Sequence, residues 1–200
     1  MTLKYSDGIE LFWGLSFYYI FGFFKVDLIH FFLFYQLLCV SIYDRGIYME
    51  RYVLSEMKDK NFSKGANEIY LLTDYNKLQY PDYYKWFYGK NIPRVITGNG
   101  EIIFYLDGLE VVGLTILKKD FEAKICTFMV NPEYRKKGFS SKLLEDSFDF
   151  LGTDKPLITI PEGRLDEFSS IIDAYGWEES SITSKYYTPE YVFNDFGKKR

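Results

Sequence analysis

The feature that most constrains this chain is a strand, a basic glycine loop and a helix in immediate succession over residues 123–151. The apolar and β-branched run Ile125–Val130 predicts the strand, and a proline-containing turn follows it. The loop Arg135–Ser140 carries three consecutive basic residues before its glycine, and apolar residues at helical spacing then continue to Leu151. Because the free N–H groups and the positive dipole end of a helix face such a loop, this succession predicts an anion-binding site.

The charge around this loop differs in sign from that of the whole chain. Between Lys118 and Lys142 there are seven basic and three acidic residues, whereas the net charge of the chain is −4. Gly138 permits close approach of the backbone to a ligand, and the small Ser140 leaves the first helical turn uncrowded. The composition suits a pyrophosphate or a phosphorylated nucleotide, and for the loop alone a solvated basic turn is an equal alternative.

The elements around the loop are predicted from apolar periodicity and turn residues. Asp107-Gly108 supplies two positive-φ positions for a tight hairpin turn, and Gly176 ends the last helix. The expected strands are 68–73, 101–106, 109–117, 123–130, 156–160, 177–182 and 186–193; the expected helices are 46–64, one that opens at Pro81 and ends or kinks at Pro93, 140–151 and 165–175. This order predicts the α/β (α+β) class, a mixed and mostly antiparallel sheet flanked by helices.

The stretch Val130–Ser140 resembles the acyl-coenzyme-A motif of the GNAT superfamily of N-acetyltransferases. That motif reads Arg/Gln-x-x-Gly-x-Gly/Ala after a strand that often ends Val-x-Pro, and Ser140 is a mild departure from it. The element order and the junction Tyr175-Gly176-Trp177 also resemble the superfamily, over about residues 66–196. Neither a P-loop nor a dinucleotide fingerprint is present.

The resemblance implies a binding site for acetyl-CoA as cosubstrate. The strand Ile125–Val130 would splay from the strand Leu157–Ile160, and the pantetheine arm would pair with its backbone like an added strand. Backbone N–H groups from Arg135 to Ser141 would hold the pyrophosphate. The cofactor-binding residues expected in this way are Phe128, Met129, Val130, Arg135, Lys136, Lys137, Gly138, Phe139, Ser140 and Ser141.

The catalytic residues match the superfamily less well. Many members carry a tyrosine that acts as general acid toward the coenzyme A thiolate, at the position of Ile172 in this chain. Tyr175, one helical turn later, is the substitute that we predict, and a packed aromatic at the helix end is the alternative. Glu162 is the nearest candidate for a general base, although positioning of the amine alone is also open.

The resemblance therefore implies an enzyme, an acetyl-CoA-dependent N-acetyltransferase in which a primary amine attacks the thioester directly. The acceptor is open between a small amine, a protein amino group and the amino group of a charged tRNA; the net charge of −4 disfavours other nucleic-acid partners. The alternative is a non-catalytic acyl-CoA-binding or protein-interaction module, which the missing tyrosine at Ile172 favours.

Histidine and cysteine usage argues against other chemistries. The single histidine, His30, lies in an apolar run, no Gly-x-Ser-x-Gly turn presents a serine, and no ligand spacing suits zinc, so we expect no metal. Cys39 and Cys126 lie in apolar runs, which predicts buried free thiols and a cytoplasmic protein.

The sequence divides into an aromatic-rich, helical extension (1–64), an N-acetyltransferase domain (65–196) and a basic tail (197–200). The apolar blocks 11–24 and 28–40 are each shorter than the roughly 20 residues of a membrane span. We expect them to pack on the domain or to form a homodimer; membrane association of residues 11–40 and a functional start at Met49 are open alternatives.

Overall fold

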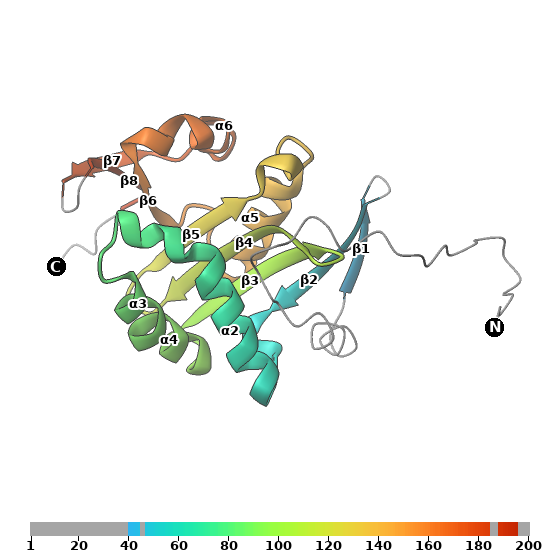
Figure 1. Cartoon of the computed structure of the whole chain (residues 1–200). Helices are drawn as coiled ribbons and strands as arrows, with labels where there is room; N and C mark the ends of the chain where they lie inside the picture. Colours follow the sequence, from blue (N-terminus) through green and yellow to red (C-terminus); the bar gives the residue numbers. More distant parts are fainter. Residues whose placement is uncertain (1–39, 45–46, 185–187, 196–200) are drawn as a thin grey trace, which may run out of the picture. The chain divides into compact units, whose positions relative to one another are not determined.

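The computed structural model describes residues 40–44, 47–184 and 188–195. The chain divides into two units, Met1–Tyr35 and Gln36–Arg200, and all described residues lie in the second. They form an eight-stranded sheet with the order β1-β2-β3-β4-β5-β6-β8-β7. Every neighbouring pair is antiparallel except β5 and β6, and helices flank the sheet (Figure 1). The predicted class, α/β (α+β) with a mixed and mostly antiparallel sheet, is confirmed.

The elements run in chain order from the first described strand to the last. Their bounds are β1 (Val40–Asp44), β2 (Ile47–Val53), η2 (Leu54–Glu56), α2 (Asp59–Thr73), η3 (Asp74–Leu78), α3 (Tyr83–Trp86), the π-helical turn η4 (Phe87–Asn91), α4 (Ile92–Ile96), β3 (Gly100–Asp107), β4 (Glu110–Lys119), β5 (Ala123–Val130), η5 (Pro132–Tyr134), α5 (Phe139–Leu151), β6 (Leu157–Pro161), η6 (Glu162–Arg164), α6 (Leu165–Tyr175), β7 (Glu179–Thr183) and β8 (Glu190–Phe193).

The three consecutive antiparallel strands β3, β4 and β5 form where the sequence predicts them. The hairpin turn differs from the prediction in one respect. Asp107 pairs with Glu110, so the two loop residues are Gly108 and Leu109, and only Gly108 has a positive φ, of 60°. A turn with glycine at its first central position needs a single left-handed residue.

Strand β3 is buried on both faces because a helical layer covers each side of the sheet. Ile103 and Tyr105 belong to the core that includes Leu143 and Leu144 of α5. Ile102, the neighbour of Ile103, is fully buried but lies outside that core. Successive residues of a strand point to opposite faces, and Figure 1 shows α2, α3 and α4 on the face opposite α5.

The helix predicted over residues 46–64 is wrong in its first half. Residues 47–53 form strand β2, which pairs with β3, and α2 begins only at Asp59. The helix was predicted because the segment is rich in charged residues, but Glu50 and Arg51 of this segment form contacts inside the fold. Glu50 is buried and accepts a hydrogen bond from Tyr52, and Arg51 forms an ion pair with Asp146 of α5 at 3.0 Å.

The strand predicted over residues 68–73 is also wrong, because this segment is the end of α2. A short apolar run does not distinguish a strand from a helix. Ala66, Ile69 and Thr73 share one helical face and are buried, whereas Leu71 and Leu72 remain exposed. The hydroxyl of Thr73 donates to the carbonyl of Ile69 at 2.7 Å, which satisfies it within the helix.

The helix expected after Pro81 forms as three joined pieces, α3, η4 and α4, and it continues past Pro93 instead of ending there. Proline has no N–H and disturbs the ordinary helical pattern before it. The chain accommodates Pro93 with a π-helical turn in which the N–H of Ile92 donates to the carbonyl of Phe87. Of the aromatic face predicted here, Phe87 is fully buried, whereas Tyr84 is mostly exposed.

The segments after α5 follow the prediction closely. Helix α6 spans 165–175 as expected, and Gly176 ends it with a φ of 57°. The last two strands are shorter than predicted, and residues 185–187 lie outside the described part of the chain.

Several predictions fall on residues beyond the described ranges. These are His30, Cys39, the basic tail and nearly all of the apolar segment 11–40. Within the described residues, no helix has the length and apolar character needed to cross a membrane.

Candidate active site

The site begins where the two parallel strands separate. Strands β5 and β6 pair only at Lys124 with Leu157 and at Ile125 with Ile158. Strand β6 pairs with β8 along its other edge, while beyond Ile125 the edge of β5 that faces β6 has no strand partner among the described residues. The predicted splay of these strands is confirmed. The bare edge offers backbone donors and acceptors to an extended ligand.

Two cavities follow this open edge of β5. The first has a volume of about 880 Å³ and takes Lys124–Phe128 into its lining, together with residues of η3, α3, α4 and β6. The second has a volume of about 520 Å³ and takes Met129–Pro132 into its lining. Tyr75 and Arg164 line both, so the cavities are neighbours along one strand.

A β-bulge lies in the part of β5 that lines the first cavity. Ile116 pairs with Thr127 and Leu117 with Ile125, which leaves Cys126 without a partner across the ladder. Cys126 is a free, half-buried thiol on the cavity lining, rather than the fully buried one predicted. Burial among protein atoms raises the pKa of this thiol to about 11, so it stays protonated at neutral pH.

The basic loop is held in a left-handed conformation at the N-terminus of α5. Lys136 has a φ of 61° and Gly138, the N-cap residue, a φ of 88°. Buried side chains fix the two ends of the loop: the hydroxyl of Tyr134 donates to Asp107 at 3.0 Å, and Phe139 packs in the core. The N–H groups of the first turn of α5 therefore face the loop without helical acceptors.

An ion-pair bridge joins the loop to α6 across the second cavity. Arg135 donates to Glu167 at 3.3 Å, and Arg164 donates to the same oxygen at 3.2 Å. The Nε of Arg135 also donates to the carbonyl of Val130 at 3.3 Å. All three charged side chains line this cavity, which follows the open edge of β5.

The structure brings the predicted cofactor-binding residues together in part. Phe128 lines the first cavity, and Met129, Val130 and Arg135 line the second. The others lie in the loop and the first turn of α5, outside these two linings; they are Lys136, Lys137, Gly138, Phe139, Ser140 and Ser141.

The two predicted catalytic residues lie elsewhere. Tyr175 packs edge-to-face on Phe148 of α5, with ring centroids 5.1 Å apart, and on Trp177. Glu162 is exposed in η6, and its backbone N–H donates to the carbonyl of Pro189. Neither residue lines either cavity. Their catalytic assignment stays a prediction that these contacts do not favour.

A carboxylate that sequence reasoning missed lies in the first cavity. Glu190 of β8 is only 2% exposed, and its carboxylate accepts hydrogen bonds from the hydroxyl of Tyr80 and, at 3.3 Å, from the amide of Gln79. The sequence signal that could have identified Glu190 is a single acidic residue at the start of the otherwise apolar strand β8. Acidic side chains are rarely fully buried unless they are paired or have a function.

A second missed group is the hydroxyl of Tyr83, which lines the same cavity. The side chain is 3% exposed, and within the described residues its hydroxyl has no hydrogen-bond partner. Burial raises the pKa of Tyr83, and the nearby polar side chains of Thr73, Asn76 and Thr127 oppose that rise. With so many tyrosines in the chain, no sequence signal distinguished this one.

Comparison with known proteins identifies the family to which the chain belongs. Among curated proteins no sequence matches the chain. The solved structures to which the chain is similar include a Bacillus subtilis acetyltransferase in complex with CoA (18% identity, 72% of this chain and 96% of that one, TM-score 0.45). The chain is also similar to an IAA acetyltransferase from Bacillus cereus (14% identity, 72% of this chain and 95% of that one, TM-score 0.48). A third similar structure is a GNAT family acetyltransferase from Elizabethkingia anophelis with acetyl-CoA bound (17% identity, 52% of this chain and 80% of that one, TM-score 0.39).

Because the three TM-scores are low, the assignment rests on the match to a family model. The model described as "Acetyltransferase (GNAT) family" matches residues 55–154, half of the chain. The matched range includes strand β5, the basic loop and α5, which are the parts that carry the sequence resemblance. The chain belongs to the acetyltransferase (GNAT) family.

Proposed function

We propose that the protein is an acetyl-CoA-dependent N-acetyltransferase that moves an acetyl group to a primary amine. The observation that carries the proposal is the open edge of β5, which runs between two cavities and ends at a basic loop on a helix N-terminus. Family membership supports acetyl transfer in general; the amine acceptor, the cosubstrate and the roles of single residues are the proposal.

The open edge of β5 and the basic loop bind different parts of acetyl-CoA. The pantetheine arm pairs with the backbone of β5 near Phe128 and Val130, as an added strand would. The pyrophosphate lies at the N–H groups between Arg135 and Ser141, where the helix dipole of α5 favours an anion. A Cβ at Gly138 would meet no atom within 4 Å, so its left-handed φ, rather than lack of space, requires glycine there.

The first cavity holds the acceptor, and Glu190 is the general base that we propose. Glu190 takes a proton from the ammonium form of the acceptor. The neutral nitrogen then attacks the thioester carbonyl carbon, a C–N bond forms and the C–S bond breaks. Coenzyme A leaves as a thiolate, and we assign the hydroxyl of Tyr83 as the hydrogen-bond donor that stabilises it. The second proton, which the nitrogen loses as it becomes a neutral amide, passes through solvent to the thiolate.

Two measurements on the full chain test this function. Calorimetry with acetyl-CoA tests binding, and release of free thiol in the presence of a panel of primary amines tests transfer. We expect binding together with amine-dependent thiol release. Absence of binding at millimolar acetyl-CoA would refute the proposal, while binding without transfer to any amine would favour the non-catalytic acyl-CoA-binding module.

A further inference from the structure

The first cavity is strongly basic, although the chain as a whole is acidic. Five basic side chains and two acidic ones line it: Lys90, Arg94, Lys118, Lys124 and Arg164 against Asp82 and Glu190. Arg164 is engaged with Glu167, and Asp82 with Lys85 outside the cavity. The excess of positive charge is thus concentrated in the remaining lysines and Arg94.

Three of these cations line the cavity together with Cys126 of the β5 bulge. Although burial raises the pKa of the Cys126 thiol, the charges of Lys124, Lys118 and Arg94 each act to lower it, and the charge of Glu122 on the adjacent turn acts to raise it. All three charges therefore lie within electrostatic range of the same sulfur atom. We call this group, Arg94, Lys118 and Lys124, the basic corner.

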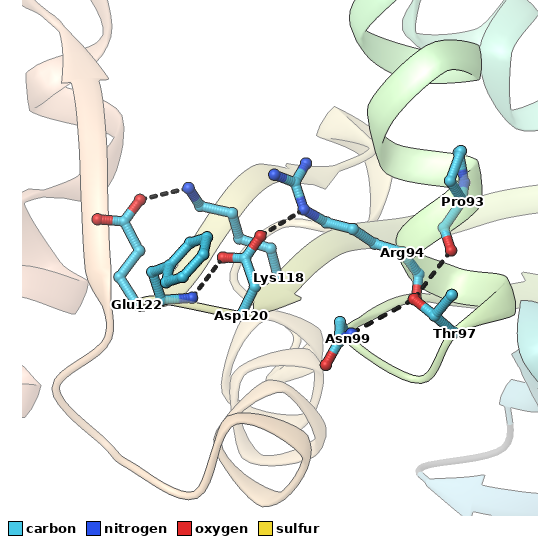
Figure 2. A network of polar contacts seen from close by, with 8 residues as sticks. Pro93, Arg94, Thr97, Asn99, Lys118, Asp120 and Glu122 are labelled. Atoms are coloured by element: carbon cyan, nitrogen blue, oxygen red, sulfur yellow. Dashed lines mark hydrogen bonds and ion pairs between the residues drawn. The ribbon is translucent and has the colours of Figure 1, made fainter.

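The turn between β4 and β5 partly neutralises the basic corner from outside the cavity. Figure 2 shows Arg94 bonded to Asp120 and Lys118 bonded to Glu122, with both carboxylates on the turn. Burial would raise the pKa of Asp120, but the hydrogen bond and the charge of Arg94 hold it below its usual value. The pair therefore stays ionised at neutral pH.

Donors of the basic corner remain available to the cavity. The bond from Arg94 to Asp120, at 2.7 Å, uses Nε, so the two terminal guanidinium nitrogens can bind another group. The ammonium of half-buried Lys124 donates to the hydroxyl of Thr159 at 3.1 Å and forms no ion pair within the described residues. The ammonium of Lys124 can therefore pair with an anionic group of a ligand in the cavity.

We propose that the basic corner binds an anionic group of the acceptor, so that the substrate is a small amine that carries a carboxylate or a phosphate. This inference rests on the proposed function. An amine without an anion would enter as a cation among like charges, which is unfavourable. An anion at the basic corner instead receives charge-assisted hydrogen bonds from a guanidinium and an ammonium, and the amine end stays in the cavity that contains Glu190.

The phosphates of the cosubstrate do not explain the basic corner. The pyrophosphate site that we propose lies after Val130, at the far end of β5 from Lys124. At about 3.3 Å per residue the two ends of this segment are roughly 20 Å apart. The two basic groups thus serve two different anions.

The test compares amines that differ in the anion alone. 4-Aminobutyrate is paired with butylamine, and phosphoethanolamine with ethanolamine, at fixed ionic strength and saturating acetyl-CoA. In at least one pair we expect kcat/KM to be about tenfold higher for the anionic member. The pair that shows the preference identifies carboxylate or phosphate as the anion.

Two variants connect that preference to the basic corner. Lys124→Gln should abolish most of it by raising the KM for the anionic amine, with no change in the KM for acetyl-CoA. Lys119→Gln is the matched control, since Lys119 donates to the carbonyl of Phe150 at 2.8 Å and does not line the cavity. It should leave the preference unchanged.

The outcomes separate this inference from the function on which it rests. Equal turnover of both members of each pair, or a preference that Lys124→Gln leaves intact, overturns the inference while amine acetylation stands. Binding of acetyl-CoA without transfer to any amine overturns the proposed function, and the acceptor class with it.

Discussion

At the scale of single residues, the fold buries polar groups where the chemistry that we propose needs them. Glu190 is buried through contacts with Tyr80 and Gln79, which lie more than a hundred positions earlier in the sequence. Local pattern does not reveal such a contact, so the sequence pointed to Glu162, the nearest carboxylate after β6. The place of Gly138 in the loop, by contrast, could be predicted from the motif, although its left-handed φ of 88° emerged only from the structure.

Replacement of Glu190 tests the assignment of the general base. Glu190→Gln keeps the size of the side chain and its contact with Tyr80 but removes the basic oxygen. We expect kcat to fall by about a hundredfold, with little change in the KM for acetyl-CoA. Steady-state thiol release measures both quantities.

The controls for this variant are the two residues that the sequence indicated. Tyr175→Phe and Glu162→Gln change groups outside the cavities, so kcat should stay within about twofold of the wild type for both. If either variant lost as much activity as Glu190→Gln, the assignment of Glu190 would be wrong.

A substitution at Gly138 tests whether the basic loop needs a left-handed conformation at this residue. An alanine in its left-handed conformation costs about 1–2 kcal/mol, although there is space for the methyl group. Gly138→Ala should lower the free energy of unfolding by that amount and weaken acetyl-CoA binding in calorimetry. Gly163→Ala, in equally open space without a positive φ, is the control; equal effects from both variants would argue against a special loop conformation.

At the scale of elements, the sequence predicted those helices and strands whose formation depends on neighbouring residues. Adjacent residues determine the β3–β4 hairpin, α5 and α6, and these elements form where expected, except that the hairpin loop is shifted by one residue to Gly108 and Leu109. Strand β2 was missed because its charged residues find partners only in the folded protein, such as Asp146 of α5 for Arg51. The strand expected at the end of α2 failed because tertiary packing, not apolar content, selects between helix and strand there.

The junction of η2 and β3 makes stability depend on pH through Glu101. Its carboxylate is 6% exposed and accepts from the backbone of Ser55 at 3.1 Å and of Ile102 at 2.9 Å. Burial raises the pKa of Glu101 above its usual 4.5, against the opposing effect of these hydrogen bonds. The folded state therefore retains this proton to a higher pH than the unfolded chain, and stability is lost as the pH rises through the folded pKa.

Urea unfolding between pH 4 and neutral pH checks this dependence. Glu101→Gln has no proton to lose, so its free energy of unfolding should rise relative to the wild type as the pH increases above about 4.5. A difference between the two proteins that is constant over this range would contradict the raised pKa of Glu101.

The bridge between the basic loop and α6 should compete with acetyl-CoA. Glu167 accepts from both Arg135 and Arg164, and its carboxylate lines the second cavity. Glu167→Gln frees Arg135 for the pyrophosphate, so the Kd for acetyl-CoA should fall by about twofold to fivefold, an effect typical of an exposed ion pair. Weaker binding in calorimetry would show instead that the bridge organises the site.

At the scale of the whole molecule, the candidate site is a consequence of sheet topology. The sheet changes from antiparallel to parallel pairing only between β5 and β6, and there the strands separate after two residue pairs. The sequence resemblance predicted this opening, which the structure confirms. The walls of the first cavity come from η3, α3, η4, α4, β4, β5, β6, η6, α6 and β8, and their convergence could not be predicted from the sequence.

The most direct test of the central claim is a crystal structure of the full chain with acetyl-CoA. We expect the pantetheine arm along β5 from Val130 toward Phe128, the pyrophosphate at Gly138–Ser141, and the thioester facing the cavity that contains Glu190. A cosubstrate bound away from β5, or a β6 that closes onto the edge of β5, would contradict the account.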